Sequence, residues 1–345
     1  GYCNNKPLDA KKTTISFEEK KNAKLILVTV ALHFLPSIKK QLMSEFSCIF
    51  APSISENKLK EIFNDYEVEG WICSPTPKYK IDKRLISHAK KLEIIVTPST
   101  GSNHIIKEDC LDRDIEVKSL KDTDFVNKIY ASSEFCFALI LSVVRNLPQS
   151  HQGSMAYKWR EAENEFRGVE MNGKTIGIVG YGRIGANVAK YSIAMDMKVC
   201  AYDPYKKIGE PVKQYDSYEK VLKLADIVVI AVHLDEFTRD MVDKRWFDQM
   251  KNGVYFINIS RGEIVDENAL IEALKSGKIK SAGLDVIRNE LSTDIKSSPV
   301  INYARNSDNL IITPHIAGLT VDSEYKAAEY SIKTISEYFG DKCEY

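Results

Sequence analysis

The stretch TIGIVGYGRIG at 175–185 decides the fold of this chain. It begins as a short apolar strand, its glycines stand in the spacing G-x-G-x-x-G, and the residues beyond them carry the period of an amphipathic helix. The spacing alone arises easily in a chain with 17 glycines, so the strand and helix around it carry the prediction. A strand, a glycine turn and a helix in this order predict a βαβ unit that binds a dinucleotide.

Each of the three glycines has a separate task in such a unit. Gly180 permits the tight turn, Gly182 lets a diphosphate approach the backbone, and Gly185 lets the helix pack closely on the strand. The diphosphate then lies at the positive end of the helix, on N–H groups that have no intrahelical partner.

An acidic residue follows at the spacing expected for the adenosine ribose. Asp203 comes 18 residues after Gly185, at the end of the strand pattern KVCAY. A carboxylate there accepts hydrogen bonds from the ribose hydroxyls and repels a 2′-phosphate, which favours NAD over NADP. Lys206 and Lys207 follow closely and would attract that phosphate, so use of NADPH remains the alternative.

Strand and helix patterns alternate on both sides of this unit. Strand runs lie at 24–30, 48–52, 70–75 and 93–100 before it, and at 198–203, 226–232, 254–260, 281–287 and 310–315 after it. One helix pattern between them has Asp266 as a cap at its start and Gly277 as the left-handed residue past its end. We expect an α/β fold with two parallel-sheet domains, Rossmann-like or flavodoxin-like.

A long apolar helix is predicted over 131–149, and a polar stretch follows it at 150–170. Met155, Tyr157 and Trp159 stand among the charges of that stretch, and aromatic residues and methionine are enriched at protein interfaces. An exposed linker is the alternative. We expect an arm that packs on a partner subunit in a homodimer.

The composition excludes several classes of protein. Lys+Arg and Asp+Glu both number 48, so no overall field attracts nucleic acid. The apolar run at 25–32 is shorter than the roughly 20 residues of a membrane span. The N-terminus lacks the layout of a signal peptide, and we predict no element of the fold before about residue 15. The seven cysteines have no spacing typical of a metal site. We expect a cytoplasmic protein without metal, nucleic-acid or membrane binding.

Three polar residues each follow an apolar strand, where open α/β sheets place their ligands. Arg261 follows VYFINIS, Glu290 follows GLDVI, and His315 follows LIITP. Taken singly, each has a structural explanation as an exposed arginine, a loop glutamate or a strand-end histidine bonded to backbone. Their common position makes them candidate catalytic residues.

Together with the glycine stretch, these motifs resemble a known family. The motifs STGSNHI, INISRGEIVDENAL, AGLDVIRNE and TPHIAG occur in the order found in the D-isomer-specific 2-hydroxyacid dehydrogenases, which include phosphoglycerate, glycerate, D-lactate and formate dehydrogenases. The resemblance covers nearly all of the chain from about residue 24. It implies a substrate domain at 1–127, completed by 320–345, into which an NAD-binding Rossmann domain at 128–319 is inserted.

The resemblance also implies roles for the three candidates. Arg261 would bind the carboxylate and carbonyl of the substrate, His315 would be the acid/base, and Glu290 would hold and polarise His315. Elementary chemistry agrees, because hydride transfer to a 2-keto acid leaves an alkoxide at C2 that needs a proton donor and a nearby cation. Arginine supplies a permanently charged fork that matches a carboxylate.

Further site residues follow from the same resemblance. In the first domain, backbone N–H groups of a loop would bind the substrate carboxylate, and the predicted substrate-binding residues are Ser74, Thr100, Gly101 and Ser102, with Asn103 closing the loop. The predicted cofactor-binding residues are Gly180, Gly182, Arg183, Ile184, Gly185, Asp203, Pro204, His233, Thr238, Ser260, Asp285 and Gly318. Among these, Asp285 would lie near the nicotinamide carboxamide.

The chain departs from the family pattern at two positions, and two further positions bear on the substrate. Ile106 replaces an Asp and Leu291 replaces a Pro, and both changes should affect only local loop geometry. Ser74 replaces the Arg with which phosphoglycerate dehydrogenases hold the phosphate, so phosphoglycerate is not the leading substrate. Glu290 argues against a formate dehydrogenase, in which the partner of the histidine is Gln.

The expected activity is therefore the NAD-dependent interconversion of a D-2-hydroxy acid and its 2-keto acid. Within the enzyme class, a phosphoglycerate dehydrogenase is the alternative. From another class, a non-catalytic NAD(H)-sensing protein similar to corepressors remains a rival, because fold does not fix function. Retention of Arg261, Glu290 and His315 favours the enzyme.

Overall fold

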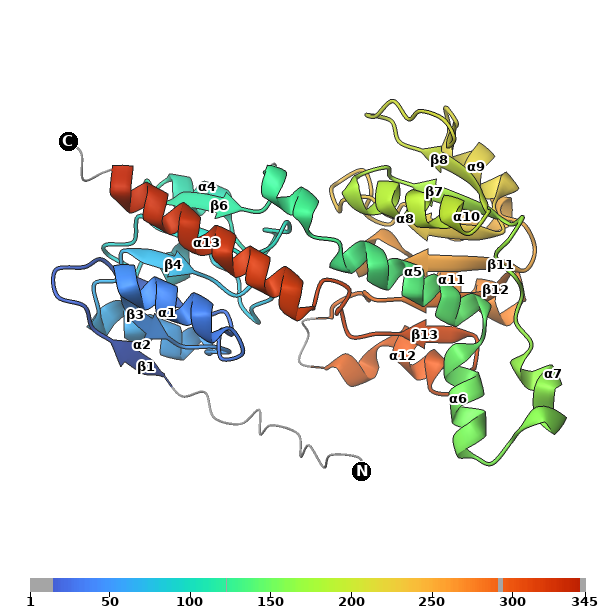
Figure 1. Cartoon of the computed structure of the whole chain (residues 1–345), viewed down its shortest axis with the longest axis horizontal. Coiled ribbons are helices and arrows are strands. Elements are labelled where there is room, and N and C mark those ends of the chain that lie inside the picture. The colour runs from blue at the N-terminus through green and yellow to red at the C-terminus, as the bar shows by residue number, and fades with distance from the viewer. Residues whose placement is uncertain (1–14, 122, 291–293, 342–345) are drawn as a thin grey trace. The chain divides into compact units, whose positions relative to one another are not determined.

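The computed structural model describes residues 15–121, 123–290 and 294–341. The chain forms two compact units, one of residues 1–129 with 320–345 and the other of residues 130–319. Each unit has its own parallel sheet with helices on both faces (Figure 1). The expected fold class of two parallel-sheet domains is confirmed.

The sheet of the first unit has the strand order β1-β3-β2-β4-β5-β6. The strands are β1 (Ser16–Glu18), β2 (Leu25–Val28), β3 (Ser47–Phe50), β4 (Gly70–Ile72), β5 (Ile94–Thr97) and β6 (Glu116–Ser119). All pairs are parallel except β1 with β3. The sequence patterns did not predict β1 or β6, because both strands are short and largely exposed.

Helices cover both faces of this sheet because successive side chains of a parallel strand point to opposite faces. On β2, Ile26 and Val28 pack in one core with α1 (Pro36–Glu45) and α13 (Val321–Asp341). Leu27 packs in the other core. The helices of that second core are α2 (Glu56–Asp65), α3 (Lys83–Ile86) and α4 (Lys107–Leu111).

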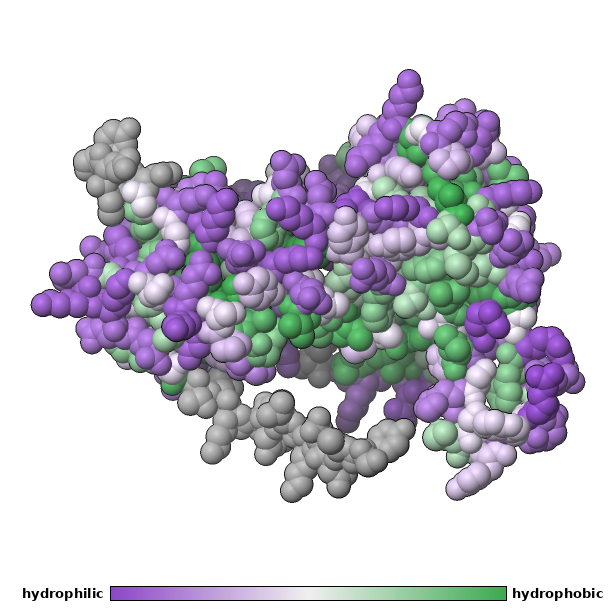
Figure 2. Space-filling view, in the orientation of Figure 1, coloured by the Kyte–Doolittle hydropathy of each residue, from purple (hydrophilic) through white to green (hydrophobic). Residues whose placement is uncertain are grey.

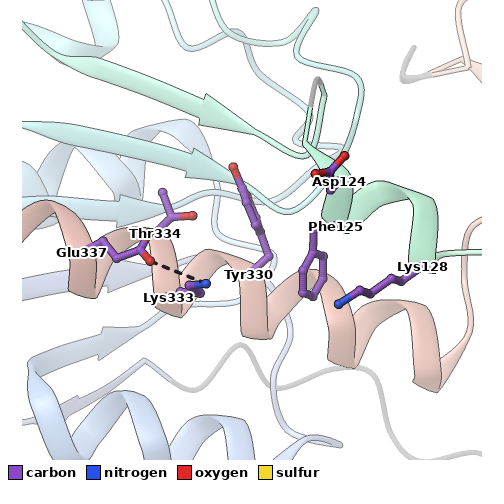
Figure 3. Close-up of a pocket in the computed structure, with 7 residues that line it drawn as sticks. All are labelled: Asp124, Phe125, Lys128, Tyr330, Lys333, Thr334 and Glu337. Carbon is purple, nitrogen blue, oxygen red and sulfur yellow. Dashed lines mark ion pairs between the residues drawn. The ribbon is translucent and has the colours of Figure 1, made fainter.

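The last helix packs on the first unit through a buried stripe at helical spacing: Ala328, Ile332, Ile335 and Phe339. The short helix η1 (Asp124–Lys128) lies close to α13. The ring centroids of Phe125 in η1 and Tyr330 in α13 are 5.7 Å apart. Both helices line a pocket of about 280 Å³. Figure 3 shows its lining residues, with Lys333 and Glu337 of α13 paired. The Tyr330 hydroxyl donates to the Ser119 carbonyl at the end of β6.

The sheet of the second unit has seven parallel strands in the order β13-β12-β11-β10-β7-β8-β9. They are β7 (Thr175–Val179), β8 (Lys198–Tyr202), β9 (Lys213–Gln214), β10 (Ile227–Ile230), β11 (Val254–Asn258), β12 (Ile279–Leu284) and β13 (Leu310–Ile312). The chain runs outward from β7 through β8 to β9 and then returns to β10 on the other side of β7. Ligands of such sheets bind at the carboxyl ends of the strands beside this reversal.

Two groups of helices cover the faces of the second sheet. One face carries α5 (Ala131–Val144) and α8 (Arg183–Ala194). The other carries α9 (Tyr218–Leu224), α10 (Lys244–Gln249), α11 (Glu267–Lys275) and α12 (Pro299–Ala304). The predicted capping of α11 is confirmed, since Asp266 accepts from the N–H groups of Asn268 and Ala269, and Gly277 has φ +75°.

The single helix predicted over 131–149 is wrong. α5 ends at Val144, Asn146 turns the chain with φ +52°, and α6 (Leu147–Met155) begins behind it. Pro148 explains the break, because it has no N–H to donate and its ring would clash with the Val144 carbonyl in a continuous helix.

The arm at 150–170 continues through η2 (Arg160–Ala162) and α7 (Glu163–Phe166). Its apolar side chains are largely exposed, with 66% for Met155, 95% for Tyr157 and 71% for Trp159. Figure 2 also shows hydrophobic residues over α5 on the surface of this unit. Of the helices that the structure describes, none is long and apolar enough to cross a membrane.

Candidate active site

The three glycines of the turn after β7 meet different surroundings. Gly180 has φ +91°, and a Cβ atom there would lie 2.6 Å from the Ala231 carbonyl oxygen. A Cβ at Gly185 would lie 2.2 Å from the carbonyl oxygen of Gly180. A Cβ at Gly182 would meet nothing within 4 Å. The fold itself requires the first and third glycines, whereas the second leaves its backbone open to a ligand.

Gly182 is also the N-cap residue of α8, and no side chain caps that terminus. The first turn carries no acidic residue, so it presents a positive dipole end to an anion. Arg183 and Ile184 form the start of this turn. Burial lowers the pKa of Arg183 from its usual value. These features fit the diphosphate of a dinucleotide.

Asp203 lies at the end of β8, beside the glycine turn. Its Oδ2 accepts the N–H of Tyr181 at 2.7 Å, and its Oδ1 accepts the N–H groups of Tyr205 at 2.9 Å and Lys206 at 3.1 Å. The carboxylate thus holds the glycine turn against the loop that begins at Pro204. The sequence indicated an acidic residue for the ribose but gave no sign of this second, structural task.

The loop after β10 carries His233 and Thr238. The Thr238 hydroxyl donates to the His233 carbonyl at 2.6 Å and accepts the N–H of Asp235 at 2.8 Å. Asp235 Oδ1 in turn accepts the N–H groups of Phe237 and Thr238, both at 2.9 Å. The Thr238 side chain therefore fixes the shape of the loop at the edge where a dinucleotide would bind.

Arg261 is presented by a turn that a buried asparagine fixes. Asn258, which is 1% exposed at the end of β11, accepts the N–H of Ser260 and donates to the Arg261 carbonyl, both at 3.0 Å. The Ser260 hydroxyl donates to the Ile230 carbonyl of β10 at 3.0 Å. Sequence reasoning missed Asn258, although a polar residue inside an apolar strand was a visible signal.

The Arg261 side chain is half-buried, and its Nη1 donates to the Ser260 carbonyl at 2.6 Å. Within the described part of the chain, no carboxylate forms an ion pair with it. Its positive charge is therefore left for an anionic ligand.

His315 and Glu290 form a pair. Nδ1 of His315 lies 2.6 Å from Oε1 of Glu290, and their side chains are 31% and 22% exposed. Since the Nδ1 nitrogen is used by the carboxylate, Nε2 is the nitrogen that can exchange a proton with a substrate. The two residues come from loops 25 positions apart that follow β12 and β13.

Asp285 holds the turn that carries His315. It is 1% exposed, and its carboxylate accepts the Thr313 hydroxyl at 2.6 Å and the N–H groups of Ile316 at 3.0 Å and Ala317 at 2.8 Å. Its carbonyl accepts the N–H of His315 at 2.8 Å, and His315 has φ +55°. Residues other than glycine rarely adopt this left-handed backbone conformation, and the contacts of Asp285 hold His315 in it. Gly318 follows in the same segment, and a Cβ there would meet only Ser132 Oγ, at 3.5 Å.

The predicted substrate loop belongs to the first unit, where Thr100, Gly101 and Ser102 follow β5. Ser99 Oγ donates to the Gly101 carbonyl at 2.6 Å, and Lys80 Nζ donates to the Asn103 carbonyl, also at 2.6 Å. These contacts leave the backbone N–H groups of Thr100 and Gly101 unused by the protein's described atoms.

Ser74 follows β4, the strand next to β5, and its N–H donates to the Thr29 hydroxyl at 3.0 Å. Behind the loop lies a pair that sequence reasoning missed, with Sγ of Cys73 3.7 Å from Nε2 of His104. Burial lowers the pKa of His104 to about 4, so this histidine is neutral at physiological pH and is not an acid/base candidate.

The departures from the family pattern have local consequences. Ile106 is the N-cap residue of α4, and no side chain caps that helix, so the hydrogen bond that an Asp would supply is absent. Leu291 lies outside the described residues. In the described ranges, no three His, Cys, Asp or Glu side chains are grouped so that they could hold a metal ion.

A family model and several known proteins match this chain. The family described as "D-isomer specific 2-hydroxyacid dehydrogenase, NAD binding domain" matches residues 137–317. The D-3-phosphoglycerate dehydrogenase of Archaeoglobus fulgidus is 34% identical over 251 residues, which are 71% of this chain and 45% of that protein. The chain thus spans about half the length of the first curated relatives it matches.

Other relatives match over most of their length. The glyoxylate reductase of Thermococcus litoralis is 32% identical over 315 residues, which are 82% of this chain and 90% of that protein. Among solved structures, the D-lactate dehydrogenase of Aquifex aeolicus, complexed with NAD and lactic acid, has a TM-score of 0.76 at 27% identity, with 93% of this chain and 97% of that chain covered. The predicted resemblance is confirmed: the chain belongs to the D-isomer specific 2-hydroxyacid dehydrogenases, a family of oxidoreductases, and residues 137–317 match its NAD-binding domain.

Proposed function

We propose that this chain reduces a small 2-keto acid to the D-2-hydroxy acid with NADH, and catalyses the reverse reaction with NAD. The observation that carries the proposal is the pair of His315 and Glu290, at 2.6 Å, at the sheet edge that also presents the unpaired cation Arg261. A protein that only senses NAD(H) would have no use for an acid/base pair beside an anion-binding arginine.

In the direction of reduction, C2 of the keto acid gains a hydride and its oxygen gains a proton. NADH supplies the hydride when bound. His315 donates its Nε2 proton to the carbonyl oxygen, so the alkoxide is neutralised as it forms and the imidazole is left neutral. Glu290 stabilises the imidazolium before the transfer, and Arg261 binds the substrate carboxylate and polarises the carbonyl.

We propose that Asp203 makes NAD the preferred cofactor. Backbone N–H groups fix its carboxylate on two sides, at 2.7 Å and 2.9 Å, so it cannot easily turn away from a 2′-phosphate. Exchange of Asp203 for Ser should weaken NADH binding and relax discrimination against NADPH. Wild-type protein that uses both cofactors equally would show that Lys206 and Lys207 outweigh the carboxylate.

We propose glyoxylate and hydroxypyruvate as the leading substrates. Of the two curated relatives named above, the glyoxylate reductase of Thermococcus litoralis is the one that this chain matches over most of its length. Phosphohydroxypyruvate is the second candidate, because two phosphoglycerate dehydrogenases are 34% and 33% identical. Ser74, which has no charge for a phosphate, speaks against it. The loop at 100–103 would bind the carboxylate through its backbone N–H groups.

We further propose that the first unit is the substrate domain, that the second is the cofactor domain, and that the chain is a homodimer through the arm at 150–170. Three large apolar side chains of the arm, Met155, Tyr157 and Trp159, are more than half exposed. Such exposure is typical of a surface that a partner covers. Tyr157→Glu with Trp159→Glu should therefore halve the mass in solution.

The test of the proposed activity is NADH oxidation with a panel of 2-keto acids: glyoxylate, hydroxypyruvate, pyruvate, 2-ketoisocaproate and phosphohydroxypyruvate. We expect turnover with at least one of the first two. NADH binding without turnover of any keto acid would contradict the enzyme and favour the NAD-sensing alternative. Exclusive turnover of phosphohydroxypyruvate would favour a phosphoglycerate dehydrogenase.

A further inference from the structure

Arg288 stands two residues before Glu290 and makes four contacts with three other segments of the second unit. Its Nε donates to the Val265 carbonyl at 2.7 Å, and its Nη2 donates to the Glu263 carbonyl at 3.0 Å. Nη2 also pairs with the Asp240 carboxylate. Its backbone N–H donates to Oε1 of Glu267 at 2.7 Å. One side chain and its amide thus tie the loop after β12 to the turns before α10 and α11.

The burial of Glu267 and the partial burial of the Arg288 side chain strengthen these contacts. Glu267 is only 6% exposed, and burial raises the pKa of its carboxyl group, an effect that the N–H and the charge of Arg288 oppose. The acidic neighbours Glu263 and Asp266 raise that pKa further. The Arg288 side chain itself is 28% exposed, so its fork is partly shielded from water.

The segment after Arg261 is packed against the same loop. A Cβ atom at Gly262 would lie 2.0 Å from the carbonyl carbon of Ile287 and 2.3 Å from the nitrogen of Arg288. The two backbones are therefore in direct contact, and only glycine allows that contact. This contact fixes the position of Arg261 relative to the start of the turn that leads to Glu290.

We propose that Arg288 is a positioning residue that holds Glu290 where its carboxylate meets His315. Asn289 lies between Arg288 and Glu290 and has φ +53°. Residues 288–290 therefore form a tight turn, and the contacts of Arg288 fix its first residue. The inference rests on the proposed function of the His315–Glu290 pair. Among the described residues, no hydrogen bond or ion pair joins Arg288 to His315 or Glu290, so Arg288 acts through the turn.

The chemistry of the fork explains why an arginine is needed. The guanidinium group reaches two carbonyl oxygens and one carboxylate with fixed geometry, whereas a lysine ammonium is a point charge on a flexible stem. Arg288→Met keeps an apolar stem of similar length and removes the fork. Arg288→Lys keeps the charge and should restore part of the effect.

The experiment follows the Nδ1–H resonance of the His315 ring by NMR in the whole protein, together with the kinetics of keto-acid reduction. We expect Arg288→Met to shift that resonance upfield, because a displaced carboxylate no longer accepts the Nδ1–H hydrogen bond. The kcat of reduction should fall about tenfold. NADH affinity should change less than twofold.

Arg245→Met is the matched control, since Arg245 also pairs with an aspartate of this unit but is 86% exposed and far from the loop in sequence. It should leave the resonance and the kinetics unchanged. Asp240→Asn removes the ion pair but keeps both carbonyl contacts, so it should give an intermediate shift of the resonance.

A folded Arg288→Met protein whose His315 Nδ1–H resonance stays at its wild-type position would overturn the proposal. If Arg288→Met does not fold, the resonances of Arg288→Lys and Asp240→Asn decide in the same way. The resonance does not depend on turnover. A wild-type chain that reduces no keto acid would therefore refute the proposed function, and the NMR measurement would still test the role of Arg288. Normal turnover of Arg288→Met with an unmoved resonance would refute the role of Arg288 alone.

Discussion

The two edges of the seven-stranded sheet use glycine for different reasons. At the amino ends of the strands, Gly173, Gly253 and Gly277 have φ between +73° and +75°, and a Cβ at any of them would meet nothing within 4 Å. At the carboxyl ends, Gly262 has backbone atoms of a neighbouring loop within about 2 Å of the Cβ position. The three glycines of the first edge need a backbone conformation, whereas Gly262 needs a close contact.

Charges differ between the two edges in the same sense. At the amino edge, Lys251 Nζ lies 2.8 Å from Oδ1 of Asp226, and both side chains are partly exposed. At the carboxyl edge, Arg261 has no such partner among the described carboxylates, and His315 is held in a left-handed conformation. The charge of Asp226 is thus neutralised by its lysine partner, whereas the turn that carries Arg261 leaves a charge available for a ligand.

The largest effect should come from the carboxyl edge. His315→Ala removes the proton donor, and we expect kcat to fall by a factor of roughly 10² to 10⁴ in both reaction directions, the range for general acid–base catalysis. NADH binding, measured by fluorescence titration, should stay near its wild-type value. Near-normal turnover of His315→Ala would show that the proton comes from another group.

A matched pair of glycine substitutions tests the difference between the edges directly. Gly262→Ala must push two backbones apart and should lower the free energy of unfolding by about 3 kcal/mol. Gly253→Ala places a side chain at φ +73° in open space and should cost only about 1 kcal/mol. Urea denaturation measures the free energy of unfolding of both variants. Equal losses would show that a glycine required for its φ and a glycine required for a backbone contact do not differ in their effect on stability.

The smallest effect should come from the amino edge. Burial raises the pKa of Asp226, but hydrogen bonds from Lys251 and the Thr175 N–H and the positive charge nearby outweigh it, so the pKa is lowered. The stability that this carboxylate contributes is therefore present above its unfolded pKa of about 3.9 and lost as pH falls through the folded value. Asp226→Asn should cost at most about 1 kcal/mol at neutral pH, because the pair is partly exposed.

Denaturation of wild type and Asp226→Asn at neutral pH and below pH 4 checks the sign of that effect. The difference in stability between them should shrink as the pH falls. A difference that grows in acid would mean that the pKa of Asp226 is raised rather than lowered.

Local patterns predicted much of the fold. The strand and helix periods and the glycine stretch gave both parallel sheets, and the capping residues Asp266 and Gly277 gave the bounds of α11. The break at Asn146 was also predictable from Pro148, because a proline disrupts the helical turn before it. The strand β1 lies at the edge of the stretch left out of the fold reasoning.

The supporting residues of the site could not be predicted in this way. Asp285 reaches a backbone N–H 31 positions away, and Arg288 pairs with an aspartate 48 positions away. Neither contact leaves a period or a spacing in the sequence, because tertiary packing alone brings those segments together. The sequence therefore indicated candidate site residues, and the structure adds which residues hold them in place.

The measurement that tests the account most directly is the pH profile of keto-acid reduction for wild type and for Glu290→Gln. Glutamine keeps the hydrogen-bonding shape at 2.6 Å from His315 but removes the charge that favours the imidazolium. Reduction needs the protonated ring, so its rate should fall with rising pH, and the fall should come at lower pH in the variant while NADH binding stays nearly intact. Coincident profiles would contradict the account, because they would show that His315 and Glu290 do not act as one acid/base unit.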